Sequence, residues 1–548
     1  MVLDAPSTSN AQHPPQSHSS RNIPSPTAKW RKQEPPVTNS DFLGANFSFD
    51  NCDHPPIWYF KQFFDENLVT WIADQSNLYC MQEKLAKNLN CKDLKATPTE
   101  VKSLLGIFLF MGIYPNPNYR SYWSGLAPNA QIQDALDGGM SRFESLKRFL
   151  HFNDNSERAQ NCADKLYKVR PVIDSVLEKC KKLEPEEYNS IDEQMIPTKS
   201  RSTIKQYMPK KPHKWGYKVF SRCGISGMLY DFEIYTGKKE GPLENSHLGI
   251  TGDLVMRLCK SLPKHMNFKV FFDNFFTSIP LIRELRKDGI LSLGTIRSNR
   301  MLGASKVLRS DKDLKKDQRG SSDWRTDVSS NVTVLKWYDN NIVHLASCFI
   351  GPHNGDTVRR WSQADKKHLE IECPLMVNEY NKFMGGVDLC DMLLSLYRIK
   401  LKSRRWYMPI FYYLLKVCVT NGWLLYRRYA NLSGVSVKSQ LTLINFQSQV
   451  AFDLINIGKL SVASGSKKGP GRPLTFTPPT KKRKTVGVPI PLGESRYDQV
   501  GHFPIYSEQQ NRCRLCPNGR SRWKCSKCEM FLCLVKERNC FFNFHVKH

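Results

Sequence analysis

Three aspartates lie in short, dissimilar contexts that are far apart in the chain: Asp192 in SIDEQMIP, Asp273 in VFFDNFFTS and Asp388 in GGVDLCD. Their spacing excludes a single turn or helix, so only a tertiary fold can bring them together. Each lies where the pattern predicts the end of a strand or the start of a core-facing helix. Carboxylates at the carboxyl ends of buried strands lie where open α/β sheets bind ligands. The pattern therefore predicts an α/β core that gathers three carboxylates.

Asp273 has the strongest individual pattern. Phe268 to Phe272 form a continuous apolar run typical of a buried strand, which ends abruptly at Asp273. Ser278 is then expected to cap a helix that carries Pro280 in its first turn. Taken singly, an aspartate is more often a cap, a turn residue or a surface charge.

Carboxylates gathered in this way suit magnesium, a hard cation that is bound by a few carboxylates and keeps waters and phosphate oxygens. Two such ions can activate an attacking oxygen and stabilise the leaving oxygen in phosphoryl transfer. The three aspartates therefore predict a catalytic site for cutting and joining nucleic acid, with two Mg²⁺ ions as cofactors.

The charge balance indicates the partner. The chain has 80 Lys and Arg against 51 Asp and Glu, a formal net charge of +29. Such a field concentrates polyanions and supports salt-dependent phosphate binding, so we expect DNA as a partner. We expect no membrane partner, because the most apolar stretch, Ile410 to Val419, is short and is interrupted by Lys416. The N-terminus shows no secretory signal, so the 17 cysteines are expected in a reducing compartment, where they favour metal binding.

Composition changes divide the chain. Residues 1–45 are poor in large apolar residues and are expected to be disordered. A helical pattern follows, with capping boxes at Thr97 to Glu100 and at Ser141 to Glu144. Strand-like runs come next, at Gly216 to Arg222 and at Leu229 to Tyr235, with glycines between them that predict a hairpin.

The region after the second aspartate changes character. Residues 301–374 are polar and broken, with short strand-like pieces, and are expected to be inserted between the second and third aspartates. Val387 to Leu396 has a helical pattern, in which Asp388 and Asp391 lie three residues apart on one face. Tyr407 to Tyr429 predicts a second helix with a buried aromatic stripe.

A basic linker, residues 458–505, carries two short motifs. Lys467 to Pro473 is similar to an AT-hook, in which Arg472 would enter a narrow A·T minor groove. The second is a cluster of the nuclear-import type, which predicts a location in the nucleus: Lys481, Lys482, Arg483 and Lys484. The alternative for both motifs is a solvated charged linker.

The last residues concentrate metal-binding side chains: Cys513, Cys516, Cys525, Cys528, Cys533, Cys540, His545 and His548. Two CxxC knuckles with trailing Cys and His supply enough ligands for two tetrahedral Zn²⁺ sites. So short a segment cannot build its own core, so the zinc is expected to be structural. The pairing stays open. An interleaved arrangement would place Cys513, Cys516 and Cys533 in one site, and Cys525 and Cys528 with Cys540 or His545 in the other.

Several motifs together resemble the piggyBac transposase family over roughly residues 48–548. They are SIDEQMIPTKSR, MPKKPHKWGYK, FFDNFFTSIPL, GTIR, NKFMGGVDLCD, RRWY and the terminal Cys/His module. The resemblance implies a DDD catalytic triad at Asp192, Asp273 and Asp388, with Asp391 as an additional metal-site residue. It also implies hydrolytic nicking, a hairpin intermediate at each transposon end, joining to TTAA target sites and a homodimer. The terminal module departs from the spacing of the founding insect enzyme.

The fold class implied by the resemblance is multidomain α/β. A ribonuclease-H-like catalytic core (188–300 and 375–396) would be interrupted by an insertion domain (301–374). A helical dimerisation and DNA-binding domain (46–187 and 397–457) would flank the core, and a zinc-binding cysteine-rich domain (506–548) would follow the linker. Basic residues in these parts are expected to contact DNA: Lys210, Lys211, Lys214, Arg404, Arg405, Arg472, Arg520 and Arg522.

Three functions compete. The leading one is an active DNA transposase. The second is a domesticated nuclear DNA-binding or chromatin protein that keeps the fold without transposing, which the complete triad argues against. The third makes the zinc module a cross-brace domain that binds histones or other proteins, although its basic and aromatic composition favours DNA.

Overall fold

The computed structural model describes residues 28–546 except 36–38, 45–46, 48–53, 125–129, 134, 159–163, 210, 238–243, 245, 364, 463–495 and 499. The chain forms two compact units, Met1–Ser466 (unit 1) and Lys467–His548 (unit 2). Lys210, Arg472, Lys481, Lys482, Arg483, Lys484 and His548 lie outside the described residues.

Unit 1 is built on a mixed sheet with the strand order β1-β8-β9-β10-β7-β6-β2-β4-β3, in which β5 also pairs with β4. The strands are β1 (Trp30–Arg31), β2 (Tyr188–Pro197), β3 (Gln206–Tyr207), β4 (Trp215–Gly224), β5 (Leu229–Ile234), β6 (Lys269–Phe272), β7 (Leu291–Thr295), β8 (Ser322–Asp327), β9 (Val332–Tyr338) and β10 (Ile342–Ser347). β2, β6 and β7 are parallel, whereas β4 and β5 on one side and β10 and β9 on the other pair antiparallel.

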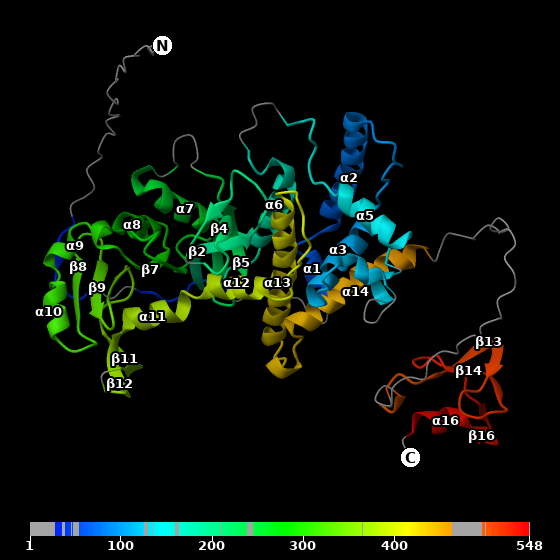
Figure 1. The fold of residues 1–548 in the computed structure, drawn as a ribbon. Coiled ribbons are helices and arrows are strands. Elements are labelled where there is room, and N and C mark those ends of the chain that lie inside the picture. The colour runs from blue at the N-terminus through cyan, green and yellow to red at the C-terminus, as the bar shows by residue number, and fades with distance from the viewer. Residues whose placement is uncertain are drawn as a thin grey trace, which may run out of the picture. The chain divides into compact units, whose positions relative to one another are not determined.

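Helices cover both faces of this sheet (Figure 1). α7 (Gly249–Cys259) and α8 (Ile279–Lys287) bury their apolar sides with Ile191 and Phe272 on one face. α11 (Leu375–Phe383) packs against Phe271 on the opposite face, and α12 (Gly386–Ser395) lies on that face against β2 and β4. Because neighbouring strand residues point to opposite faces, the helix on each face is set by the alternation along β2 and β6.

A helical body is formed from both ends of unit 1. The blue α3 and the orange α14 lie side by side in Figure 1, and α1 packs against α13. The helices of this body are α1 (Pro56–Lys61), α2 (Glu66–Lys87), α3 (Pro98–Ile113), α5 (Gly139–Phe149), α6 (Arg170–Lys181), α13 (Met408–Leu432) and α14 (Leu443–Val462). Shorter helices are α4 (Ala130–Gln133), α9 (Ala304–Val307) and α10 (Asp311–Lys316).

The predicted helix at Tyr407 to Tyr429 is confirmed as α13. Within the described residues, α13 is long and apolar enough to cross a membrane by length and composition. Its most apolar 18-residue window is 89% buried inside the structure, as in the core helix of a folded domain.

Two of the three helix caps predicted from the sequence are confirmed. Thr97 and Glu100 form the expected capping box of α3, and the Ser278 hydroxyl accepts from Leu281 N at the start of α8. The second predicted capping box is wrong, because α5 begins at Gly139 after the left-handed Gly138. Ser141 therefore lies inside the helix rather than at its cap.

The prediction of disorder over residues 1–45 is wrong at β1. Trp30 and Arg31 pair with β8, and the Trp30 indole donates to Leu302 O at 2.9 Å. Lys29 N donates to the Asp327 carboxylate at 2.8 Å. The partner strand lies almost 300 residues away, so no local pattern announces the pairing.

Residues 301–374 contribute to the main sheet. β8, β9 and β10 continue it beyond β7, while β11 (Asn354–Ser362) and β12 (Lys367–Pro374) form a separate hairpin next to α11. The antiparallel hairpin predicted around Gly224 and Gly227 is confirmed as β4 and β5.

Unit 2 is small and has a core made largely of cysteines. Its elements are β13 (Pro504–Arg512), β14 (Arg520–Cys525), β15 (Leu534–Val535), β16 (Arg538–Asn539) and α16 (Cys540–His545). Six of the nine buried members of its apolar cluster carry sulfur: Cys513, Cys525, Cys528, Cys533, Cys540 and Met530. Sulfur-containing side chains therefore form most of this core.

Candidate active site and metal centres

Asp192 and Asp273 are brought side by side by strand register. The parallel pairing of β2 with β6 ends at the pair Ile191 and Phe272, so the next residue on each strand is an aspartate. In-register residues of adjacent strands point to the same face and lie about 4.8 Å apart between backbones. The two carboxylates therefore lie next to each other at the carboxyl end of the parallel pairing.

Backbone donors fix both carboxylates. The Asp273 carboxylate accepts from Phe275 N at 2.9 Å in a turn that ends β6. The Asp192 carboxylate accepts from Glu193 N at 2.7 Å. Each side chain is thereby held at the carboxyl end of the parallel pairing, in the middle of the sheet, where it is only partly exposed.

Asp388 is placed by the docking of α12 on β2. Val387 N donates to the Ser190 hydroxyl at 3.0 Å, and Ser190 lies two residues before Asp192 on the same face of β2. A Cβ on Gly386 would lie 2.7 Å from the Ser190 hydroxyl oxygen, so only glycine permits this approach. Asp388 lies in the first turn of α12 and is exposed.

The electrostatics of the site follow from burial and crowding of like charge. Burial raises the pKa of Asp192 to about 7, and the nearby charges of Glu193 and Asp273 add to the rise. Burial also raises the pKa of Asp273, against the opposing effect of Arg297. Both carboxylates therefore gain from a cation, which would compensate the charge that burial disfavours.

Asp391 lies in a different charge environment. Burial and the charge of Asp388 raise its pKa, whereas Lys211, His213 and Arg398 lower it. Asp391 is thus a neighbour of Asp388 that faces basic residues. Its predicted role as a metal ligand stays a prediction.

Oxygen donors at this edge of the sheet suit Mg²⁺, which keeps several waters in its coordination shell. Among the described residues, two groups of three or more possible metal ligands have all their ligand atoms within 4.8 Å of one another, and both groups lie in unit 2. The three aspartates do not form such a group. Strand register brings Asp192 and Asp273 together, and α12 lies beside them. The three carboxylates do not converge closely enough to contact one ion together.

Sequence reasoning missed two side chains beside the aspartates. Thr295 ends β7 and occupies the register position next to Asp273. Tyr380 of α11 interacts with Thr295, and burial together with the three aspartate charges raises its pKa to about 12. A tyrosine in an amphipathic helix and a threonine at a strand end have no distinctive spacing, so only the fold reveals them.

The basic residues expected to contact DNA have different surroundings. Lys211 Nζ donates to Glu193 O at 2.9 Å, which places it beside the aspartates, while Lys214 and Arg404 are exposed. Arg405 instead donates to the carbonyls of Leu150 and Lys147. These contacts give Arg405 a structural role between α5 and α13, and its predicted phosphate contact stays a prediction.

Unit 2 contains two sets of metal ligands. Cys513, Cys516, Cys533 and Cys540 form the first, and His502, Cys525, Cys528 and His545 form the second. In the first set, the Cys516 and Cys533 sulfurs are 3.7 Å apart. Zinc bound to sulfur at about 2.3 Å in a tetrahedron requires a sulfur separation of about 3.8 Å. The first set therefore fits zinc.

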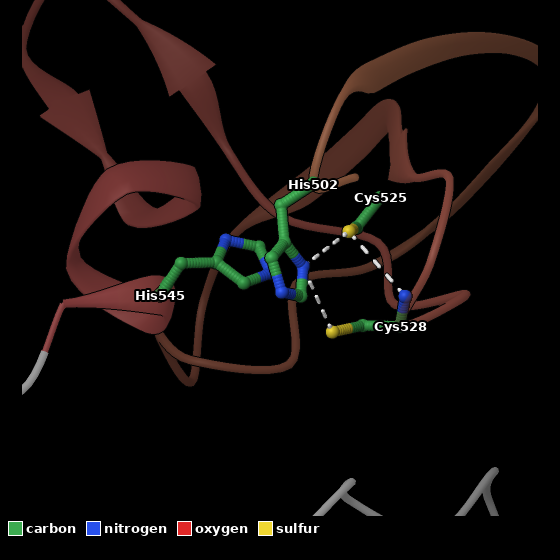
Figure 2. Close-up of side chains that lie close together, drawn as sticks. All are labelled: His502, Cys525, Cys528 and His545. Carbon is green, nitrogen blue, oxygen red and sulfur yellow. Dashed lines mark hydrogen bonds between the residues drawn. The ribbon is translucent and has the colours of Figure 1, made fainter. Parts of the chain in front are cut away.

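The second set also fits zinc (Figure 2). His502 Nδ1 lies 3.4 Å from the sulfurs of both Cys525 and Cys528. Its other nitrogen contacts the Asp498 carboxylate at 2.9 Å, the arrangement that commonly orients a zinc-binding imidazole. His545 Nε2 is buried without a hydrogen-bond partner among the described residues, while its Nδ1 contacts Phe541 O at 2.8 Å. A metal ion would satisfy that nitrogen.

The ligand pairing corrects part of the sequence interpretation. The two sets are interleaved along the chain, as expected. Of the two alternatives for the second set, His545 is confirmed, whereas Cys540 joins Cys513, Cys516 and Cys533. His502 was missed, because it precedes the first knuckle by 11 positions and has no characteristic spacing. Arg520 and Arg522 are exposed on β14, and Arg522 donates to the Tyr506 hydroxyl at 3.0 Å.

A family model described as Transposase IS4 matches residues 55–423, which include all three aspartates and most of unit 1. The chain belongs to the IS4/piggyBac transposase family. Family membership supports an enzyme that cuts DNA with divalent metal ions in general.

Human relatives and a solved structure extend this likeness within the transposase family. The chain is 29% identical to the human PiggyBac transposable element-derived protein 3 over 96% of its own length and 83% of the relative. It is 29% identical to the human PiggyBac transposable element-derived protein 2 over 84% of its own length and 72% of that protein. The fold matches a piggyBac transposase in a synaptic complex with hairpin DNA, with a TM-score of 0.61, 20% identity and 87% of this chain covered.

Proposed function

We propose that this chain is a metal-dependent DNA transposase with a ribonuclease-H-like core, in which Asp192, Asp273 and Asp388 form the catalytic triad. The observation that carries the proposal is the register of β2 and β6, which places Asp192 beside Asp273 at one sheet edge. The strand order β5-β4-β2-β6-β7, with antiparallel pairing before β2 and parallel pairing after it, supports such a core.

Two Mg²⁺ ions bound there would polarise the attacking oxygen and neutralise charge on the leaving oxygen. Asp192, Asp273 and Asp388 would hold these ions, and through them the scissile phosphate and the attacking group would be positioned. Water would first break one phosphodiester bond and free a 3′-OH. That hydroxyl would then attack the opposite strand, forming a hairpin and releasing the flanking DNA. Water would open each hairpin and free its 3′-OH again, and these hydroxyls would attack TTAA target DNA and join the ends to it.

The remaining parts of the proposal rest on charge and on unit 2. We propose two structural Zn²⁺ ions in the two ligand sets, double-stranded DNA ends bound by the basic surfaces, and action as a homodimer in the nucleus. The basic cluster Lys481, Lys482, Arg483 and Lys484 supports nuclear import through its sequence. Asp391 would assist Asp388 from the same helix.

A plasmid excision assay tests the triad. Asp192→Asn, Asp273→Asn and Asp388→Asn are each expected to abolish strand cleavage while DNA affinity stays nearly unchanged, because asparagine keeps the size but loses the charge that holds a metal. Asp391→Asn is expected to reduce cleavage without abolishing it. Cleavage at the normal rate by any of the three triad variants would overturn the assignment.

The second candidate is a domesticated nuclear DNA-binding or chromatin protein that no longer transposes. It is favoured by the names of the human relatives, which describe those proteins as derived from transposable elements. Inverted repeats flanked by TTAA around the coding region would support the transposase, and their absence together with failed excision would support domestication. Binding of unit 2 to histone tails in preference to DNA ends would support the third function, a protein-interaction module.

A further inference from the structure

Two aromatic rings are exposed at one edge of the sheet in unit 1. Tyr207 on β3 and Trp215 on β4 are directly opposite each other in the ladder, and their ring centroids are 4.8 Å apart at an interplanar angle of 48°. Tyr207 is 50% exposed and Trp215 is 53% exposed. Single exposed aromatics are common, whereas a cross-strand pair this exposed leaves a continuous aromatic surface in water.

The segment of sequence that carries this pair is basic. Between Glu193 and Asp231 the sequence contains no acidic residue, and its basic residues are Lys199, Arg201, Lys205, Lys210, Lys211, Lys214, Lys218 and Arg222. Lys205 Nζ lies 5.0 Å from the centroid of the Trp215 ring. An aromatic surface with a cationic rim matches a ligand that combines flat rings with negative charge.

The pair lies on the same face of the sheet as Asp192. Asp192 pairs with Ser221 in the β2–β4 ladder, and Trp215 is six residues before Ser221, so both point to one face. Six residues of strand span about 20 Å. Lys211, from the segment between Tyr207 and Trp215, reaches back to Glu193 O. A strand of DNA with about 3.4 Å between phosphates would cover this distance in about six nucleotides.

We propose that Tyr207 and Trp215 form a stacking platform for unpaired nucleobases of the DNA bound at the aspartate face. The proposal rests on the proposed function, because excision at TTAA sites creates single-stranded flanks. Bases inside a duplex cover each other's faces, whereas an unpaired base can offer a face to the rings anywhere along a strand. Stacking on aromatic side chains tolerates any base, while the lysines hold the phosphates.

The test compares two DNA probes bound to the full-length protein with its zinc retained. One is a blunt duplex and the other carries a four-nucleotide TTAA overhang in which 2-aminopurine replaces one adenine. Tyr207→Ala and Trp215→Ala are each expected to weaken binding of the overhang probe about five- to 150-fold, the range for loss of one base–aromatic stack. They are also expected to remove the quenching of 2-aminopurine fluorescence on binding.

Matched variants serve as controls. Trp215→Phe keeps a ring and is expected to retain quenching. Trp361 on β11 is 55% exposed, so Trp361→Ala removes an equally exposed tryptophan and is expected to leave overhang binding unchanged. Unchanged melting temperatures would show that the folds are intact.

The proposal is overturned if Tyr207→Ala and Trp215→Ala bind the overhang probe like the unmodified protein. It is equally overturned if both variants lose affinity for the blunt duplex by the same factor. It is also overturned if polyglutamate, but not unlabelled overhang DNA, displaces the overhang probe from the unmodified protein. Binding is measured without cleavage, so the outcome is separate from the triad test. If Asp273→Asn loses excision while Trp215→Ala binds the overhang normally, the stacking platform is overturned and the catalytic triad stands.

Discussion

Asp192 and Asp273 stand beside each other because two parallel strands end their pairing one residue earlier. At the scale of single residues this proximity is a cost, since burial and neighbouring carboxylates both disfavour the ionised forms. A divalent cation removes the cost, so the same charges that weaken the metal-free fold favour metal binding. The stability of the fold and the metal affinity of the site are therefore linked through Asp192.

The first prediction concerns Asp192→Asn without metal. The folded pKa of Asp192 is about 7, above its ordinary value of 3.8, so the folded protein binds the proton more tightly. The stability that this proton provides is complete below about pH 4 and is lost as the pH rises through 7. In EDTA at pH 8, Asp192→Asn is expected to raise the free energy of unfolding by about 1–2 kcal/mol, after allowance for solvent screening.

Urea denaturation at pH 4 and at pH 8 checks this expectation. The two proteins should be equally stable at pH 4 and should differ at pH 8. A spectroscopic probe in unit 1 keeps this measurement separate from the loss of zinc from unit 2 in EDTA. Addition of Mg²⁺ at pH 8 should stabilise the unmodified protein more than the variant. A variant that is less stable at pH 8 in EDTA would contradict the assigned direction.

The second prediction separates phosphate contacts from structural arginines. Lys214 is exposed and lies three residues after Lys211 in the sequence, so Lys214→Gln is expected to reduce the slope of log K against log salt by about 0.9, the loss of one phosphate contact. Arg405 is engaged with the carbonyls of Lys147 and Leu150. Arg405→Gln is therefore expected to lower the melting temperature and to leave the slope unchanged. DNA-binding titrations at several salt concentrations would reveal a reversed pattern.

At the scale of elements, local patterns predicted what local chemistry controls. The apolar run ending at Asp273 is β6, and the hydroxyl of Ser278 caps α8 as expected, because both depend on neighbours within four residues. The box at Ser141 failed because Gly138 adopts the left-handed conformation that begins α5 three residues earlier. Capping composition can occur inside a helix as well as at its start.

Non-local pairing set the limit of the sequence interpretation. β1 exists because an edge of β8 is available to it, and nothing within residues 1–45 indicates that edge. In unit 2 the CxxC spacing predicted metal binding, whereas the partners of each knuckle depend on how β14 and α16 pack. Cys540 and His545 lie at opposite ends of α16 and therefore join different ligand sets. Register, which joined Asp192 to Asp273, is likewise a property of the sheet and of neither segment alone.

The third prediction concerns the approach of α12 to β2. A Cβ on Gly386 would collide with Gly224 O and lie 2.7 Å from the Ser190 hydroxyl oxygen. Gly386→Ala is therefore expected to destabilise unit 1 by about 1–3 kcal/mol and to displace Asp388 from the other aspartates. Cleavage should fall by at least tenfold, because small displacements at a reacting centre are costly.

Gly385 provides the matched control, since a Cβ there would meet nothing within 4 Å. Its φ of −73° is also accessible to alanine. Gly385→Ala should therefore unfold at nearly the same urea concentration as the unmodified protein and cleave normally. Equal effects of the two substitutions in a denaturation series and a nicking assay would show that close packing of α12 does not control the position of Asp388.

At the scale of the whole molecule, each of the two units is stabilised internally by a different kind of interaction. Unit 1 has large apolar clusters on both sheet faces and in its helical body. Unit 2 has a small cluster in which cysteines replace most hydrocarbon side chains. A domain with so little apolar burial relies on metal binding for its folding free energy. The two units should therefore respond differently to removal of zinc.

The fourth prediction is that a strong zinc chelator unfolds unit 2 while unit 1 keeps its structure. Amide hydrogen exchange should become fast across β13, β14 and α16 and stay slow in β2, β6 and α13, because zinc stabilises only the unit that binds it. His502→Ala should release one of two zinc ions, since His502 belongs to a single ligand set with Cys525, Cys528 and His545. Exposed His247 of unit 1 supplies the control, and His247→Ala should retain both ions. Uniformly faster exchange in both units, or full zinc content in His502→Ala, would contradict this division of the molecule into an apolar unit and a metal-stabilised unit.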